Sequence, residues 1–521
     1  MMRRMKHLIG AFEGFAMQTM NTRREFLRDA TCLFAAAGFG RVFAAPPGVF
    51  TAGTPNLTFG VLSDIHIHFD GEAVKGLAPE KDSSLIAFRN MLELFRDSGA
   101  DAVAIAGDLA NTGLASQLRQ VAKTWFEVFP DDRAPDGRKV ERVFVYGNHD
   151  ASEGMARRQC PDEAAMKANA LALDQAKWWK EIFHEDYAPV YRKTVKGYDF
   201  IGAHWKGNCR GMDDSFCKDL ESFYAEVGPK LDPKKPFFHI QHPHPKGTVH
   251  GPGVWGQDDG VSVKVLSNYP NAIAFSGHSH NSLLDERAVW QGAFTSVATG
   301  TTYTIGSSAL PSGVPWGFEN YKTRGGKKAA AYDHVRVMPP IARGLGRQGQ
   351  LVRVYDDRIV FSRFDALTKK PLADDLVMPL PAAGRKPFAF APREAAAKAP
   401  AFPAGAAVSF AACESKRRDA KKGDAPIPCL AVSVPAAIGE PSAVGVRYRI
   451  VVTGEGAEPL ELAVLHDAFR FALSDKRARA PLTCPIALER LPKGKVRFAV
   501  TAYSWWDKAS ATLEAVRDVG A

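Results

Sequence analysis

The sequence predicts an α/β layered domain over residues 56–381 and a smaller all-β domain over residues 404–521. Two observations predict the first domain. Short apolar runs rich in β-branched residues are typical of buried strands, and longer segments with helical spacing lie between them. The second domain shows strand-like runs at turn-punctuated spacing with little helical periodicity. That pattern predicts an immunoglobulin- or fibronectin-III-like sandwich.

The first domain contains five predicted buried strands and three predicted helices. The strands are residues 57–63, 102–106, 143–146, 237–240 and 272–275, and the helices are residues 82–98, 113–129 and 164–183. The first helix repeats apolar side chains at helical spacing, at Leu85, Phe88, Leu92 and Phe95, and Gly99 ends it. Near the end of the domain, residues 352–355 and 358–361 flank Asp356 and Asp357 and predict a hairpin.

A change of composition separates the two domains. Residues 382–403 are rich in Pro and Ala, which predicts a linker. Beyond it, residues 446–452 and 495–503 are the clearest predicted strands of the second domain.

Composition narrows the class of protein. The chain has 521 residues, of which 45% are hydrophobic and 24% charged, a balance that excludes a wholly disordered or collagen-like chain. Its net charge of +10 is modest for this length, so we expect no nucleic-acid partner. We expect no transmembrane helix, because no run of 18 apolar residues occurs. Six cysteines lie beyond residue 45, which permits disulfides without requiring them: Cys160, Cys209, Cys217, Cys413, Cys429 and Cys484.

Residues 1–45 resemble a twin-arginine signal peptide. Arg23 and Arg24 are followed by Phe26 and Leu27, then by a mildly apolar run, and Met20 is an alternative start. The resemblance implies that the twin-arginine translocase exports the folded protein to the periplasm or the exterior. A short cytosolic amphipathic helix is the alternative interpretation.

All five predicted strands end in residue types that bind metal ions. In chain order these are Asp64 and His66, then Asp108, then Asn148, His149 and Asp150, then His242, and finally His278 and His280. The carboxyl ends of parallel strands meet at one edge of a sheet, so we expect these side chains to share a site. Carboxylate, imidazole and amide ligands without a thiolate suit Mn, Fe or Zn. They are sufficient for two ions that share one carboxylate.

The ordered motifs DxH, GD, GNHD, H and GHxH resemble those of the calcineurin-like metallophosphoesterase family, over residues 56–381. The resemblance implies a four-layer α/β/β/α sandwich and hydrolysis of a phosphate ester by a metal-bridging hydroxide. It implies two divalent or trivalent ions. Asp64, His66, Asp108 and His280 would hold one, and Asp108, Asn148, His242 and His278 the other.

The resemblance also implies roles beyond the metal ligands. His149 would donate a proton to the leaving oxygen, and Asp150 would orient His149. His242 is favoured over His244 as a ligand because it follows its strand directly. Candidates for substrate contact are His68, His244 and Tyr303, and residues 300–345 are long enough for a lid.

The function expected from these features is that of an exported phosphoesterase, with diesters favoured over monoesters. Purple acid phosphatases have a tyrosine after the GD motif, whereas Asn111 occupies that neighbourhood here. A monoesterase of that kind is therefore disfavoured. The alternative from another class is a periplasmic or cell-surface binding protein with a structural metal site, whose sandwich domain binds glycan or envelope. The oligomeric state is not predicted.

Overall fold

The computed structural model describes residues 53–68, 83–206, 214–252, 254–303, 305, 346–382, 384–415, 425–439 and 443–520. Residues 45–521 form one compact unit. The predicted signal peptide, Cys209 and most of the predicted lid lie outside the described residues. Across the ranges given above, no helix has both the length and the apolar character needed to span a bilayer.

The first sheet holds the first three predicted strands. It has six strands in the order β12-β11-β10-β1-β2-β3. β1 (Leu57–Leu62), β2 (Ala102–Ala106) and β3 (Glu141–Val145) are parallel. The predicted hairpin is confirmed as β10 (Gln348–Val354) and β11 (Arg358–Asp365), with β12 (Leu376–Pro379) at the edge. The carboxyl ends of β1, β2 and β3 therefore lie at one edge.

The second sheet also has six strands, in the order β4-β5-β6-β7-β9-β8. β5 (Tyr198–Ala203), β6 (Phe237–Ile240), β7 (Ala272–Ser276) and β9 (Thr295–Ala298) run parallel. β4 (Val190–Val195) and β8 (Val289–Gln291) close the two edges as antiparallel strands.

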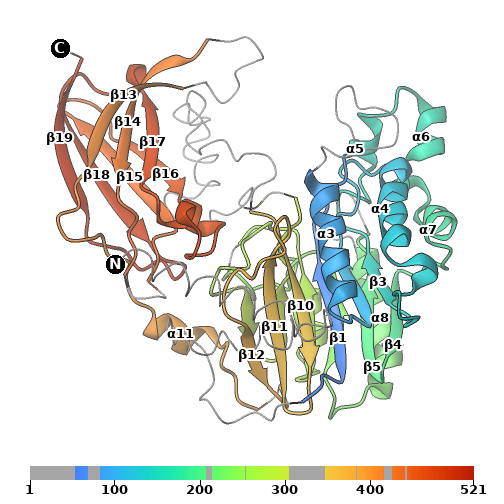
Figure 1. Ribbon diagram of the computed structural model, residues 1–521. Coiled ribbons are helices and arrows are strands. Elements are labelled where there is room, and N and C mark those ends of the chain that lie inside the picture. Colours follow the sequence, from blue (N-terminus) through green and yellow to red (C-terminus); the bar gives the residue numbers. More distant parts are fainter. Residues whose placement is uncertain are drawn as a thin grey trace, which may run out of the picture. The chain divides into compact units, whose positions relative to one another are not determined.

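Three hydrophobic clusters arrange these elements in four layers. The sheets pack on each other through side chains such as Phe59, Phe200 and Phe238. The outer face of the first sheet packs against α3 (Ser83–Asp97), α4 (Ala115–Val128) and α7 (Gln175–Phe183) (Figure 1). The outer face of the second sheet packs against α8 (Asp214–Val227) and α9 (Val261–Leu266). Both faces of each sheet are covered, which explains why most side chains of the parallel strands are buried.

The single helix predicted over residues 164–183 is wrong. The segment contains α6 (Glu163–Asn169), a 3₁₀ turn η4 (Leu171–Leu173) and α7, preceded by the short helix α5 (Glu153–Arg157). The chain leaves the helical conformation at Ala170, whose ψ is 120°. Asp174 then caps α7 by accepting a hydrogen bond from the backbone N–H of Lys177 at 2.9 Å. A capping carboxylate thus starts a new helix inside a continuous apolar pattern.

The C-terminal part is all-β, as predicted. β13 (Ser409–Ser415), β14 (Ile427–Val434) and β17 (Leu482–Ala487) form one sheet. β16 (Leu460–Leu465), β15 (Arg447–Gly454), β18 (Gly494–Tyr503) and β19 (Leu513–Val519) form another. Both are antiparallel and share one hydrophobic cluster. The immunoglobulin-like identity stays a prediction.

The predicted linker contains ordered structure. α11 (Phe390–Ala396) lies within it, and Arg393 is buried and donates a hydrogen bond to the carbonyl of Val289 at 3.3 Å. The guanidinium also lies 5.3 Å from the ring of Trp506. These contacts hold the segment against both neighbouring parts of the chain.

Candidate metal centre

The residues predicted as metal ligands come together at the carboxyl ends of the two sheets. Asp64, Asp108 and Asn148 follow β1, β2 and β3, while His242 and His278 follow β6 and β7. All five side chains are buried. The parallel strands explain this convergence, because each carries its polar residue to the same edge.

The first cluster consists of Asp64, His66, Asp108 and His280. The Nε2 atom of His280 lies 3.0 Å from Oδ1 of Asp64 and 3.1 Å from Nε2 of His66. The Nε2 atom of His66 lies 3.4 Å from Oδ2 of Asp108. One donor atom from each residue lies within 4.8 Å of the others, which suits coordination of a common ion.

The second cluster consists of Asp108, His242 and His278. The Nε2 atom of His242 lies 3.2 Å from Oδ2 of Asp108 and 3.0 Å from Oδ1 of Asn148. Asn148 therefore supplies a neutral oxygen at this cluster. Because Asp108 belongs to both clusters, it is called the shared carboxylate below.

The hydrogen-bond partners of His242 show that this cluster is suited to hold a cation. Its Nδ1 lies 2.7 Å from the carbonyl oxygen of Ala106, so Nδ1 carries a proton and donates it. The neutral ring then presents the lone pair of Nε2 to oxygen atoms of Asp108 and Asn148, which are also acceptors. With the amide oxygen of Asn148 facing Nε2, a cation among these three acceptors, either a proton on Nε2 or a metal ion, satisfies all of them. A bond from the second ring nitrogen to a backbone carbonyl is typical of metal-binding histidines.

The electrostatics of the clusters favour positive charge. Burial opposes the charge of His242, but the shared carboxylate and Asp64 outweigh it and raise the pKa of this imidazole to about 9. Burial lowers the pKa of His66 to about 4 and that of His278 to about 3. Those two rings are therefore neutral near pH 7 and keep a lone pair for a cation.

Five of the predicted ligands have left-handed backbone conformations. Their φ angles are 50° at Asp64, 47° at His66, 55° at Asp108, 70° at His278 and 53° at His280. Such angles are uncommon outside glycine and cost about 1–3 kcal/mol each. Strained residues of this kind cluster at functional sites, and here they coincide with the two clusters.

A glycine makes the close approach of two motifs feasible. A Cβ atom on Gly147 would lie 2.2 Å from Oδ1 of Asp108. The same oxygen accepts a hydrogen bond from the backbone N–H of His149 at 2.8 Å. The GNHD loop thus folds directly onto the shared carboxylate.

His149 lies beside the first cluster and belongs to neither one. Its ring centroid is 4.4 Å from that of His66, and the side chain is half-buried. Its Nδ1 donates to the carbonyl oxygen of Asn111 at 2.7 Å, which fixes the tautomer and leaves Nε2 available for proton transfer.

The structure corrects the predicted role of Asp150. Its carboxylate accepts backbone hydrogen bonds from Gly147 at 2.8 Å, Leu109 at 3.1 Å and Ala110 at 2.7 Å. The carbonyl of Asn111 orients His149 instead. Asp150 therefore joins the GNHD loop to the GD loop. Burial and the charge of Asp108 raise its pKa to about 7, against the opposing effect of the three N–H groups.

The three candidates for substrate contact lie in different environments. Tyr303 is 4.9 Å from His66 between ring centroids, and its hydroxyl lies 3.5 Å from Nε2 of His68. Both side chains are partly exposed at the edge of the first cluster. His244 is buried, and its two ring nitrogens lie 2.8 and 2.7 Å from the hydroxyls of Ser276 and Ser279. His244 is thus held by side chains of the GHxH region.

Sequence reasoning missed two tryptophans at the second cluster. Trp205 is buried, 5.5 Å from His278 between ring centroids. Trp255 is 43% exposed and 4.4 Å from the same ring. The sequence around Trp255 shows only an irregular segment after β6. The contact with His278 arises from the folding of the loop, so no local pattern predicts it.

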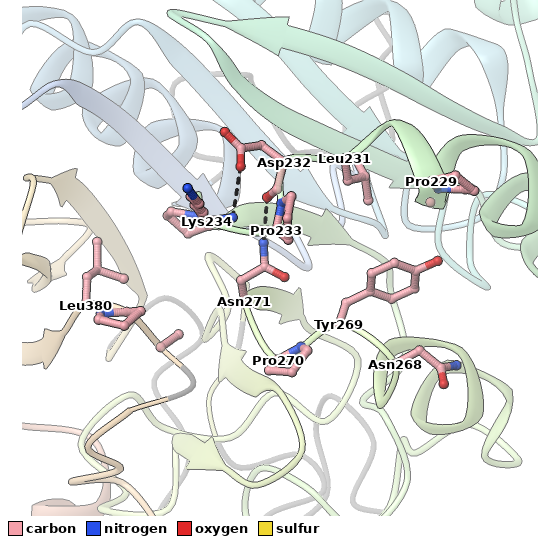
Figure 2. Close-up of a pocket in the computed structure, with 14 residues that line it drawn as sticks. Pro229, Leu231, Asp232, Pro233, Lys234, Asn268, Tyr269, Pro270, Asn271 and Leu380 are labelled. Atoms are coloured by element: carbon pink, nitrogen blue, oxygen red, sulfur yellow. Dashed lines mark hydrogen bonds between the residues drawn. The ribbon is translucent and has the colours of Figure 1, made fainter.

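A separate cavity of about 530 Å³ lies at the opposite ends of β6 and β7 (Figure 2). Prolines and Tyr269 form much of its lining, and Asn271 donates a hydrogen bond to the carbonyl of Asp232 at 3.1 Å. No cluster residue lines it. The cavity is therefore distinct from the candidate metal centre.

Comparison with known proteins agrees with this geometry. The model of the calcineurin-like phosphoesterase family matches residues 57–282. This supports a calcineurin-like metallophosphoesterase domain, from a family of binuclear-metal-dependent phosphoester hydrolases. The match ends before β8, although β8 to β12 complete the two sheets. No curated protein matches the chain.

Several solved structures are similar to part of the chain. A dimetal phosphatase from Danio rerio is 11% identical, with 62% of this chain and 99% of that chain covered and a TM-score of 0.34. Purple acid phosphatase from yellow lupin (Lupinus luteus) is 13% identical, with 62% and 54% covered and a TM-score of 0.37. GAP50, the anchor in the inner membrane complex of Plasmodium, is 11% identical, with 61% and 87% covered and a TM-score of 0.33. These values are too low to bear on substrate or partner.

Proposed function

We propose that this chain is an exported phosphoesterase that uses two metal ions and favours phosphodiesters. The observation that carries the proposal is the shared carboxylate, since Asp108 belongs to both candidate metal clusters. Two ions bridged in this way are typical of enzymes that transfer phosphoryl groups. The family match over residues 57–282 supports the same chemistry.

The proposed ligands follow the two clusters. Asp64, His66, Asp108 and His280 would hold one ion, and Asp108, Asn148, His242 and His278 the other. The ions would be Mn, Fe or Zn, in keeping with the ligand types. When bound, they would supply an activated water and neutralise charge on the phosphate.

His149 is the proposed proton donor to the leaving oxygen. Its Nδ1 is committed to the carbonyl of Asn111, so a proton on Nε2 is the one that can be transferred. The ring lies 4.4 Å from that of His66, so the donor would stand beside a substrate bound at the first cluster. Residues that donate a proton in the transition state typically contribute about 10²–10⁴-fold in rate.

The test is turnover of a bis-aryl phosphodiester and of its monoester by the purified protein, with Mn²⁺ added or with chelator. We expect metal-dependent turnover, faster with the diester. His149→Ala should lower kcat by about 10²–10⁴-fold and retain both ions. His184→Ala is the matched control, because that exposed histidine ends α7 beside Phe126 and belongs to neither cluster. No turnover of either ester by protein that holds two ions would contradict the proposal.

Export is the second part of the proposal and has its own test. The twin-arginine pattern in residues 22–28 implies the twin-arginine translocase as partner and the periplasm or exterior as destination. Replacing Arg23 and Arg24 by Lys should leave uncleaved protein in the cytoplasm. Equal export of this variant and the unmodified chain would contradict it.

A further inference from the structure

Trp255 presents an exposed aromatic ring beside the second cluster. Its side chain is 43% exposed, whereas most large apolar side chains of the described chain are buried. The indole centroid lies 4.4 Å from the ring centroid of His278, and the two planes are inclined by 34°. The exposed indole of Trp255 therefore lies directly against His278, a proposed metal ligand.

The loop that carries Trp255 is held by hydrogen bonds directly after it. The backbone N–H of His244 donates to the carbonyl of Gly256, and that of Asp258 donates to the carbonyl of His244, both at 2.8 Å. His244 in turn contacts the hydroxyls of Ser276 and Ser279. The loop is thus tied to the end of β7 and to the GHxH motif.

Two further features define the position of the loop. Gly256 has a φ of 95°, and a Cβ atom there would lie 3.1 Å from Cδ2 of His278. Nδ1 of His250 lies 3.0 Å from Oδ2 of Asp285, which anchors the preceding part of the loop. A loop held by such contacts loses less conformational entropy when a second ring stacks on its indole.

We propose that Trp255 is a specificity residue, on which a planar aromatic group of the ester's alcohol, such as a nucleobase or a phenyl ring, stacks. This inference rests on the proposed function and names the substrate class of the same site. A phosphate held at the clusters places its alcohol within reach of neighbouring side chains. Among the described residues, the indole of Trp255 offers an exposed aromatic surface beside the second cluster. Stacking tolerates any planar ring, so it selects a class of alcohol rather than one base.

The experiment compares phosphate esters with similar alkyl leaving groups. AMP and benzyl phosphate carry a ring, whereas glycerol 3-phosphate does not, and the methyl diester of each completes the set. Trp255→Leu keeps an apolar side chain without aromaticity, and Trp255→Phe keeps a ring. We expect Trp255→Leu to raise KM about ten-fold or more for the ring-bearing esters, with kcat retained. KM for the glycerol esters should stay unchanged, and Trp255→Phe should restore most of the loss.

A binding measurement separates this inference from the proposed function. Phosphonate analogues of AMP and of glycerol 3-phosphate, which are not hydrolysed, are titrated into metal-loaded protein. Trp255→Leu should weaken only the AMP analogue. Equal loss for both analogues, or no loss for either, would overturn the role of Trp255. Absence of turnover by the unmodified enzyme would instead refute the proposed function, and the titration would still decide the stacking. A larger effect on AMP than on benzyl phosphate would identify the ring as a nucleobase.

Discussion

Replacing Asp150 by Asn should weaken both the fold and the candidate metal centre. The carboxylate accepts three backbone hydrogen bonds, two at Oδ2 and one at Oδ1. In the Asn variant the amide oxygen can still accept from the N–H groups of Leu109 and Gly147. Its NH₂ group then faces the N–H group of Ala110, which loses its acceptor. The loss of one hydrogen bond to a charged acceptor costs about 1.5–3 kcal/mol.

A second effect lowers this cost. The charge of Asp108 helps to raise the pKa of Asp150 to about 7, so the neutral amide also relieves a repulsion. Bound ions would offset the charge of Asp108 and remove this repulsion. For metal-loaded protein we therefore expect the free energy of unfolding to fall by about 2 kcal/mol, as measured by urea denaturation at pH 8. Since the GNHD loop is then less well held, metal affinity should fall about ten-fold by calorimetric titration.

Asp101→Asn is the matched control for this substitution. Asp101 is a buried carboxylate that accepts from the backbone N–H of Thr58 at 3.0 Å, at the opposite end of the same strands. It should lose stability without any change in metal affinity. If Asp150→Asn changed neither quantity, or lowered stability alone, the proposed link between the two loops would be refuted.

Three further outcomes follow from the geometry. Gly147→Ala should bind fewer than two ions, measured by elemental analysis of purified protein, because the added methyl overlaps the shared carboxylate; a full complement of ions would contradict this. Asn111→Ala should keep kcat within a few-fold in the same ester assay, because His149 uses the backbone carbonyl and not the side chain; a loss as large as that of His149→Ala would show that the amide is needed. Burial opposes the charge of Asp285, but Arg287 and His250 together outweigh it and hold the pKa of this carboxyl below its usual range. The stability that Asp285 contributes is thus present above its unfolded pKa of about 3.9 and is lost as the pH falls toward the folded value. The difference in unfolding free energy between wild type and Asp285→Asn should shrink from pH 6 to pH 3, and a constant difference would refute the assignment.

Much of the catalytic fold and of the ligand set could be predicted because each signal is local. A short apolar run identifies a buried strand, and the polar residue that follows it marks the edge where strands converge. Asp64, Asp108 and His278 each follow a strand in this way, and parallel topology then brings them together. The choice of His242 over His244 used the same rule, and the structure groups His242 with the second cluster.

Four features of the structure could not be predicted, because they depend on backbone contacts or on the packing of a whole segment. Asp150 binds backbone N–H groups, and the acceptor for His149 is a backbone carbonyl, so neither partner has a residue signature. The break at Ala170 lies inside a continuous apolar pattern, and only the capping residue Asp174 signals it. The position of Trp255 depends on how a whole loop packs on His278.

The two clusters draw their residues from two different sheets. Asp64, Asp108 and Asn148 follow strands of the first sheet, whereas His242 and His278 follow strands of the second. Ions bound there would act as a non-covalent cross-link between halves that also meet through a hydrophobic interface and through hydrogen bonds such as that from His242 to Ala106. At a concentration 1,000 times its Kd, one such ion would add about 4 kcal/mol to the free energy of unfolding. If the chain is exported folded, as proposed, ions bound before export would add this stability in the compartment where the chain is made.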